Sequence, residues 1–413
     1  MKKIFAIVLS MIILASALAF PVSAYDYLDY SQETIDYYKN LGLQGTTINV
    51  YNWGEYISDE DIDVVREFEH LTGISVNYTT FESNENMYSK IVGGGVSYDI
   101  IIPSDYMVEK LINEGMLEKI DYSNIPNYDN YYDKEKYGYL TDTTINDEKV
   151  SDYAIIYNVG TTILIYNTKY VKEKPDSWTV MWDEQYKGKV LMFNNPRDSF
   201  AIAQFILGQS LNTTDPDEWD AAAALLKEQK DKVSPSYVMD EVFVDMESGD
   251  YYLAAYYAGD YELMHENNPD LDYVLPKEGV NSFYDAFLIP NSTQNKAGAE
   301  AFINFMLEPE IALANAEYIY YATANKSVIE NEDYSLAESK AVYPDPEDIA
   351  NAQVFHDLPT ETLQYMNTLW TKVKGENNAN SIYIVSLICL IAIAAIIVVT
   401  LLRKRKMRKY YKV

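Results

Sequence analysis

The sequence predicts an α/β protein built from two lobes. Short apolar strands alternate along the chain with segments whose apolar residues recur at helical spacing, which is typical of βαβ units and not of a sandwich. Roughly 350 residues lie between two terminal segments of different composition, and a chain of that size normally divides into two lobes. The only cysteine, Cys389, excludes a disulfide framework, so the core must hold the domain together by packing.

The two ends of the chain predict that the protein is exported and anchored in a membrane. Residues 1–24 combine a basic start, an apolar stretch and a small-residue cleavage site, which indicates a secretory signal peptide. Residues 382–402 carry no charge over about 21 positions, enough for a transmembrane helix, and the basic residues of 403–413 predict a cytoplasmic tail. With a polar linker at 375–381, we expect a single-pass protein of the cell membrane, whose domain faces the periplasmic or extracellular side.

The charge of the exported region is strongly negative. The chain has 63 acidic and 32 basic residues, and nine of the basic ones lie in 1–24 and 403–413, where there is no acid. The remainder therefore carries 63 acidic against 23 basic residues, a net charge of −40. Such a field repels nucleic acid and favours the approach of cations, so no nucleic-acid partner is expected. An acidic surface that keeps an exported protein in solution explains the charge equally well.

The predicted elements begin after residues 25–45, a Tyr- and Asp-rich leader interpreted as a spacer or a surface-packed arm. Periodicity and end signals then predict the following order: a strand at 46–52, a capping box at Ser58–Asp61, a helix at 62–71 stopped by Gly73, strands at 74–79 and 98–102, a helix at 107–115, and a loop to about 150. Later helices are predicted at 297–308, ending at Pro309, and at 360–374.

Two apolar runs predict where the chain crosses between the lobes. Residues 154–167 form a long β-branched run, and residues 283–290 form a second one. These crossings divide the chain into a first lobe, residues 46–155 and 286–325, and a second lobe, residues 156–285 and 326–374. No internal repeat is evident.

Three loops that each follow an apolar strand carry the strongest functional signal. They present aromatic rings and side-chain oxygens: Trp53, Tyr56, Glu82, Ser83, Ser104 and Tyr106. Ring faces attract an ammonium group, and carboxylates or hydroxyls accept its N–H bonds. The loops therefore predict a trap for a small cation.

Six motifs in this order resemble the spermidine/putrescine-binding proteins, the solute receptors of polyamine ABC importers. They are VYNWGEY, FESNENMY, YDIIIPSDYMVEKLINEGML, YKGKVLMFNNPRDSF, YYAGDY and LPKEGVNSFYDAFLIP, and the similarity runs from about Thr46 to Lys374. The resemblance implies a type II periplasmic-binding-protein fold, in which two α/β lobes joined by a hinge close on a ligand in the cleft between them.

The resemblance also implies a set of ligand-binding residues. These are Trp53, Tyr56, Ser104, Tyr106, Asn195, Asp198, Tyr257, Phe283, Asp285 and Tyr321. Three positions depart from the family's pattern: Gly54 replaces a threonine, Asn195 replaces a carboxylate, and Phe355 replaces a glutamine. Asp198 and Asp285 remain as carboxylates that would oppose the ligand's charge, because burying an ammonium without a counter-charge is costly. Without the resemblance, Asp198 beside Arg197 reads equally well as a surface ion pair. Asp105, Glu82 and Asp260 are further candidates whose direction the sequence leaves open.

Catalysis finds little support in the sequence. The histidines His70, His265 and His356 are far apart and have no metal-ligand spacing, and GxSxG, HExxH and P-loop motifs are absent. We therefore expect no enzyme activity, no metal and no cofactor.

The predicted function is a membrane-tethered receptor that captures spermidine or putrescine. Its expected partners are the polyamine, the importer's permease with its ATPase, and the membrane through the C-terminal helix. A receptor for another small solute, or a surface sensor module that reuses the fold, remains as an alternative.

Overall fold

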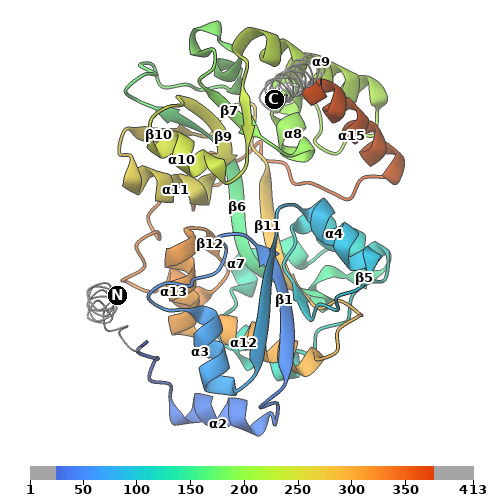
Figure 1. The fold of residues 1–413 in the computed structure, drawn as a ribbon, viewed down its shortest axis with the longest axis vertical. Helices are drawn as coiled ribbons and strands as arrows, with labels where there is room; N and C mark the ends of the chain where they lie inside the picture. The colour runs from blue at the N-terminus through green and yellow to red at the C-terminus, as the bar shows by residue number, and fades with distance from the viewer. Residues whose placement is uncertain (1–24, 376–413) are drawn as a thin grey trace, which may run out of the picture.

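The computed structural model describes residues 25–375, which form two lobes stacked along the long axis of the molecule (Figure 1). A ten-stranded sheet runs through both lobes, and its main path has the strand order β2-β1-β3-β11-β6-β9-β7-β8. The long strand β6 (Ala154–Asn167) and its antiparallel neighbour β11 (Ser282–Leu288) span the junction between the lobes.

The first lobe places three loops at one edge of its sheet. Strand β1 (Thr47–Trp53) pairs in parallel with β2 (Ser75–Phe81) and with β3 (Ile100–Ile101). Helices follow each strand: α3 (Val64–Thr72), α4 (Asn84–Gly93) and α5 (Asp105–Asn113). Because parallel strands end at the same edge, the loops that begin at residues 54, 82 and 102 meet there.

The start of α3 corrects the predicted capping box. The cap is Asp63, whose side chain accepts a hydrogen bond from the backbone N–H of Arg66, and the helix begins at Val64. Ser58 instead donates its hydroxyl hydrogen to the carbonyl of Ile62 (2.7 Å) and so closes the loop before the helix. The predicted end is confirmed, because Gly73 adopts the left-handed conformation of a C-cap, with φ of 70°.

The leader is a packed arm and not a spacer. It contains helix α2 (Gln32–Asn40), which the sequence analysis did not predict. The hydroxyl of its buried Tyr38 donates to Glu308 (3.3 Å) and accepts from the amide of Asn304 (2.9 Å). The buried carboxylate of Glu67 accepts hydrogen bonds from the Leu28 backbone and from the Tyr30 hydroxyl. These contacts attach the arm to the outer end of the first lobe.

The segment before residue 150 is also more ordered than predicted. In place of a loop, it contains four short helices and a hairpin: η1 (Tyr122–Asn124), α6 (Pro126–Tyr131), α7 (Lys134–Thr141), β4 (Thr144–Ile145), β5 (Glu148–Lys149) and η2 (Val150–Asp152). Stacking of Tyr128 on Tyr132, with ring centroids 4.7 Å apart, helps to order it.

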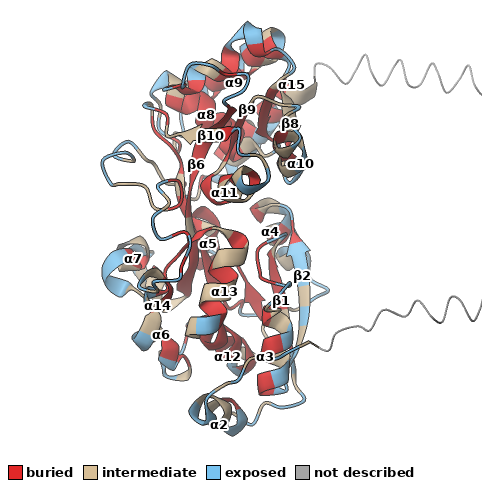
Figure 2. Ribbon diagram, turned by 90° about the vertical axis from the view of Figure 1, so that its left-hand side faces the viewer, coloured by how far each residue is buried: buried red, intermediate tan, exposed pale blue. Residues whose placement is uncertain are grey.

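The apolar run at 154–167 does cross between the lobes. Nearly every residue of β6 is buried (Figure 2). Its first half pairs with β11 and β12 (Ala322–Thr323), and its second half pairs with β9 (Leu253–Tyr257) and β10 (Leu271–Val274). The register between β6 and β11 shifts between Asp285 and Ala286, so the sheet is irregular at the junction.

The second lobe surrounds strand β7 (Val190–Phe193), which pairs in parallel with β8 (Ser236–Val238) and with β9. Its helical elements are η3 (Trp178–Trp182), η4 (Glu184–Tyr186), α8 (Pro196–Leu207), α9 (Pro216–Val233), α10 (Glu241–Glu247), α11 (Ala258–Asn267) and α15 (Thr360–Gly375). The predicted last helix at 360–374 corresponds to α15, which packs on α9.

The first lobe is completed by α12 (Lys296–Met306), α13 (Pro309–Ile319) and α14 (Lys326–Ile329). Pro309 ends the predicted helix and also opens α13. At the start of the segment 326–374, which the sequence assigns to the second lobe, the observed contacts differ from that assignment. Val328, Tyr334 and Leu336 pack on Ala312 and Ala316 of α13, so this stretch stays with the first lobe. The other lobe boundaries stay predictions.

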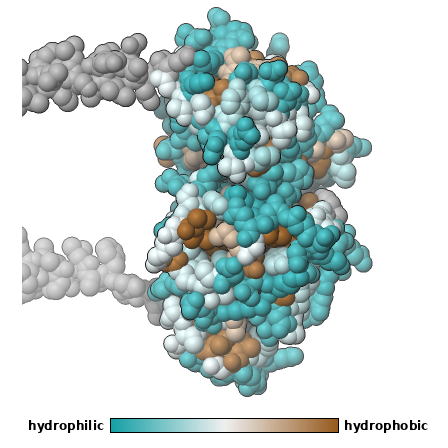
Figure 3. Space-filling view, turned by 90° about the vertical axis from the view of Figure 1, so that its right-hand side faces the viewer, coloured by the Kyte–Doolittle hydropathy of each residue, from teal (hydrophilic) through white to brown (hydrophobic). Residues whose placement is uncertain are grey.

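The predicted signal peptide at 1–24, the transmembrane helix at 382–402 and the tail at 403–413 lie outside the described residues, as does the linker beyond Gly375. Within 25–375, no helix is long and apolar enough to cross a membrane. The face shown in Figure 3 is largely hydrophilic, with hydrophobic residues in small separate areas.

Candidate functional site

Asp285 lies at the junction, where β11 changes register, and is 4% exposed. One carboxylate oxygen accepts a hydrogen bond from the hydroxyl of Ser104 (2.7 Å), and the other accepts from the hydroxyl of Tyr56 (2.7 Å). Burial raises the pKa of Asp285 to about 6, although both hydroxyl bonds act to lower it. The structure thus joins three predicted site residues around one carboxylate that forms no ion pair within residues 25–375.

Tyr56 continues the site towards the second lobe. Its ring is perpendicular to that of Tyr321, with centroids 5.1 Å apart. The hydroxyl of Tyr321 donates to Asp260 (3.0 Å), in the first turn of α11. A side chain at Gly259 would place its Cβ 2.5 Å from the ring of Tyr321, so glycine permits this close approach. The bond joins a first-lobe residue to a second-lobe carboxylate.

Asp260 is a site residue whose role the sequence left open. Its carboxyl is enclosed, and burial raises its pKa to about 7; the Tyr321 hydroxyl lowers it and the charge of Asp240 raises it. A signal was present in the sequence, because Asp260 lies three residues after Tyr257 at the end of a strand. Only the fold shows that its carboxylate meets Tyr321.

Asp198 lies in the first turn of α8 and is 7% exposed. It accepts hydrogen bonds from the Tyr257 hydroxyl (2.8 Å) and from the amide of Asn195 (2.6 Å). Asn195 is also the N-cap of α8, since its oxygen accepts from the backbone N–H of Asp198 (2.9 Å). Asn195 therefore orients a carboxylate here. Burial is the main cause that raises the pKa of Asp198.

A row of aromatic rings connects the two carboxylates. Phe283 of β11 contacts Tyr257, with centroids 5.4 Å apart, and lies 6.4 Å from Tyr321. It also covers Gly160, where a Cβ would lie 2.5 Å from its ring. The site thus runs without interruption through Asp285, Tyr56, Tyr321, Phe283, Tyr257 and Asp198. Carboxylates at both ends and rings between them suit a slender molecule with a cation at each end.

Tyr106 lies beside this row, in contact with a buried cation. Its hydroxyl donates to Glu85 (3.0 Å), and the guanidinium of Arg197 lies 5.1 Å from its ring centroid. Arg197 is 3% exposed and lies 4.3 Å from the ring of Phe355. It donates to Asn212 and to the carbonyl of His356, and its Nε and Nη1 have no partner among the described residues. Arg197 is thus buried, which contradicts the alternative that Arg197 and Asp198 form a surface ion pair.

Trp53 is the predicted site residue that the contacts leave apart from the others. It ends β1 and packs on Phe81, with centroids 4.4 Å apart, and its indole N–H has no hydrogen-bond partner in the described part of the chain. The adjacent Gly54 faces α10, because a Cβ there would lie 3.7 Å from the carboxylate of Asp240. Glu82 is exposed, whereas Asp105 is buried.

The chemistry of the site favours an organic cation. Its acids, Asp285, Asp260 and Asp198, are all buried enough to raise their pKa values, so a ligand ammonium would supply a missing counter-charge. Within residues 25–375, no cluster of three or more His, Cys, Asp or Glu side chains could hold a metal ion.

Known proteins resemble the chain over most of its length. The model of a bacterial extracellular solute-binding protein family matches residues 63–342. The spermidine/putrescine-binding periplasmic protein of Escherichia coli strain K12 is 35% identical over 316 residues, which cover 76% of this chain and 87% of that protein. A putrescine-binding periplasmic protein of Pseudomonas aeruginosa is 30% identical, and the match covers 79% of this chain and 92% of that protein.

Two solved structures are similar in fold and in sequence. A Listeria monocytogenes structure described as a spermidine/putrescine ABC transporter has a TM-score of 0.74 and 35% identity. The substrate-binding protein of a spermidine/putrescine ABC transporter from Streptococcus pneumoniae has a TM-score of 0.65 and 34% identity. Each comparison covers 80% of this chain and 99% of the other.

Proposed function

Since this chain belongs to the spermidine/putrescine-binding proteins, within the bacterial extracellular solute-binding proteins, we propose that it captures spermidine or putrescine outside the cell and delivers it to an ABC importer. The predicted α/β periplasmic-binding-protein fold is confirmed by this membership. The family consists of binding proteins and not of enzymes, which agrees with the lack of catalytic motifs in the sequence.

One observation carries the proposal: the row of rings that ends in Asp285 and Asp198. A polyamine has methylene chains that pack on rings and ammonium groups that need carboxylates. Each cation–π contact contributes about 0.5–2 kcal/mol, and micromolar affinity requires about −8 kcal/mol, so two charge pairs and a few rings suffice.

Binding is coupled to the arrangement of the lobes. Tyr56 and Ser104 come from the first lobe, Asp198 and Tyr257 come from the second, and Asp285 lies between them. A ligand that contacts both groups favours the closed arrangement, because its differential contacts shift the equilibrium. Closure around the ligand would present a defined surface to the importer's permease.

The proposed tether is the apolar segment at 382–402, exported behind the signal peptide at 1–24 and followed by a cytoplasmic tail. Confinement near the membrane would raise the receptor's local concentration at the importer. If washing membranes with high salt alone released the intact protein, the tether would be disproved, because a transmembrane helix is extracted only by detergent.

A receptor for a different small solute is the second candidate, and Arg197 favours it. Two nitrogens of its buried guanidinium, Nε and Nη1, have no hydrogen-bond partner among residues 25–375, and the group lies against the rings of Tyr106 and Phe355. An acceptor group on a ligand, such as the carboxylate of an amino acid, would bind there.

Calorimetric titration of the detergent-solubilised full chain distinguishes the two candidates. We expect micromolar or tighter binding of putrescine or spermidine and no heat from arginine or ornithine. Binding of the amino acids without binding of any polyamine would overturn the proposal in favour of the second candidate.

A further inference from the structure

The loop after β1, residues 54–58, carries Tyr56 into the site and is held from behind by two other elements. The hydroxyl of Tyr157, on β6, donates to the carbonyl of Tyr56 (2.5 Å). The same hydroxyl accepts a hydrogen bond from the amide of Asn315 on α13 (2.8 Å). The oxygen of that amide accepts from the backbone N–H of Ser58 (3.0 Å). The two side chains therefore bind the backbone on both sides of Ile57.

The loop needs such support because its own conformation is strained. Glu55, immediately before Tyr56, adopts the left-handed region with φ of 47°, which a non-glycine residue rarely occupies. The amide of Asn52, within the described residues, is the other side chain that donates to the Tyr56 carbonyl, and this bond is long, at 3.3 Å. Tyr157 and Asn315 thus hold the backbone of the loop from outside its own sequence, while Asp285 and Tyr321 contact its Tyr56 side chain.

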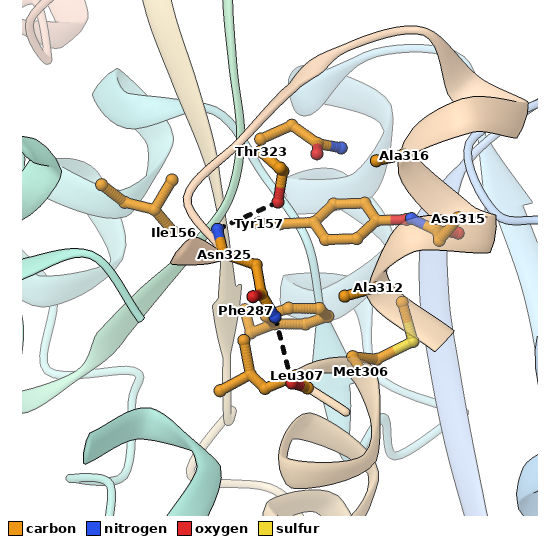
Figure 4. A pocket seen from close by; sticks show the side chains of 11 residues that line it. Ile156, Tyr157, Phe287, Met306, Leu307, Ala312, Asn315, Ala316, Thr323 and Asn325 are labelled. Atoms are coloured by element: carbon orange, nitrogen blue, oxygen red, sulfur yellow. Dashed lines mark hydrogen bonds between the residues drawn. The ribbon is translucent and has the colours of Figure 1, made fainter. Parts of the chain in front are cut away.

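Tyr157 is itself well fixed. It is buried, its ring lies 4.8 Å from that of Phe287, and β6 is paired on both sides. Tyr157 and Asn315 line a cavity of about 20 Å³ together with Asn158, Thr323 and Asn325 (Figure 4). That volume holds about one water molecule, so a polyamine does not fit in this cavity.

We propose that Tyr157 and Asn315 are positioning residues, which act on the ligand through Tyr56 and Asp285. The connection is continuous: Asn315 holds the Tyr157 hydroxyl, that hydroxyl holds the Tyr56 backbone, and the Tyr56 hydroxyl holds the Asp285 carboxylate. A buried, desolvated carboxylate is sensitive to the loss or displacement of one donor. This inference rests on the proposed polyamine-binding function and deepens it.

The variant Tyr157→Phe tests the proposal in the full chain. It removes one hydroxyl from a site where the ring still fits. We expect a loss of affinity for putrescine and spermidine of about tenfold, measured by titration calorimetry. Tyr166→Phe is the matched control, since Tyr166 is also a buried residue of β6, and its hydroxyl donates to Asp272 (2.6 Å) in the second lobe. The control should bind within about twofold of the unaltered protein.

A double-mutant cycle separates positioning from a general loss of packing. In a Tyr56→Phe background, the hydroxyl that reaches Asp285 is gone, so adding Tyr157→Phe should change affinity by less than about twofold. An undiminished tenfold effect in that background, or equal affinities for Tyr157→Phe and Tyr166→Phe, would overturn the positioning role. Failure of the unaltered protein to bind any polyamine would instead overturn the proposed function.

Asn315→Asp provides a second variant in case Tyr157→Phe does not fold, as judged by circular dichroism. The replacement keeps the acceptor for the Ser58 N–H and removes the donor towards Tyr157. We expect weaker polyamine binding, by severalfold. Unchanged affinity in folded Asn315→Asp would contradict the connection from α13 to the site.

Discussion

Polyamine affinity should fall steeply as the pH is lowered from 8 to 5. In the ligand-free site, burial raises the pKa of Asp285 to about 6 and that of Asp260 to about 7. The ligand's amines keep their charge throughout this range, because alkyl ammonium groups titrate near pH 10. A cation prefers ionised carboxylates, so the protonated forms that accumulate below pH 7 compete with binding.

The magnitude follows from the two pKa values. At pH 5, a carboxyl with a pKa of about 6 is protonated about ten times more often than it is ionised, and one with a pKa of about 7 about a hundred times more often. If Asp285 alone must ionise, affinity drops about tenfold between pH 8 and pH 5. If Asp260 must ionise too, the drop approaches a thousandfold, or about 4 kcal/mol.

Titration calorimetry in two buffers with different heats of ionisation measures both the affinity and the proton exchange. We expect proton release on binding between pH 6 and 7, and close to none at pH 8.5. An Asp260→Asn variant should lose the upper part of the pH dependence, whereas Asp147→Asn, at an exposed loop position, should retain all of it. Constant affinity from pH 5 to 8, or proton uptake on binding, would refute the reasoning.

Three further predictions test the same site. Asp285→Asn should weaken polyamine binding by about 2–4 kcal/mol, because it leaves a buried ammonium without its counter-charge, and calorimetry should show a larger loss than for Asp147→Asn. Gly259→Ala should lower both polyamine affinity and melting temperature, because its Cβ would displace the ring of Tyr321 at an overpacking cost of about 1–3 kcal/mol. Gly93→Ala is the control, since the space around Gly93 is open. Equal behaviour of the two variants would contradict the role of the close contact at Gly259. The contribution of Asp285 to the stability of the ligand-free protein should be lost as the pH rises from about 4 to 6, because the folded state, with a pKa of about 6, holds that proton over an interval where the unfolded chain has released it. A contribution of Asp285 that grows over this interval, seen as a difference in melting temperature between the unaltered protein and Asp285→Asn, would count against it.

The sequence could predict the elements that its own periodicity encodes. The strand at 46–52, the crossing at 154–167 and the glycine stop at Gly73 all follow from local patterns, and the structure has each of them. Helix α2 and the order before residue 150 depend on distant partners instead. The carboxylate of Glu67 holds the leader from 37 to 39 residues away, and no local pattern reveals that contact.

The candidate site shows the same division. Motif resemblance selected the residues around Asp285 and Asp198, but the role of Asp260 required the approach of Tyr321 from 61 residues away. The cap of α3 was missed because both Ser58 and Asp63 suit an N-cap, and only the fold shows that the Ser58 hydroxyl closes the preceding loop. The contact of Asn195 with Asp198 depends on helix geometry, which sets a cap residue beside the side chain three positions later.

A bound cationic ligand would stabilise the protein, because it would offset the desolvation cost of the carboxylates in the candidate site. Asp285 is buried and Asp260 is partly buried, each beside hydroxyl groups, and neither forms an ion pair within residues 25–375, so the ligand-free protein bears the cost of desolvating them. Protonation relieves that cost at low pH, and an ammonium relieves it at neutral pH. A proton and an ammonium group cannot both neutralise the same carboxylate. The burial that destabilises the ligand-free site therefore also favours the binding of a cation. Under the proposed function, the chain therefore gives up stability at the junction of its lobes, and this site would prefer charged amines to neutral molecules of the same shape.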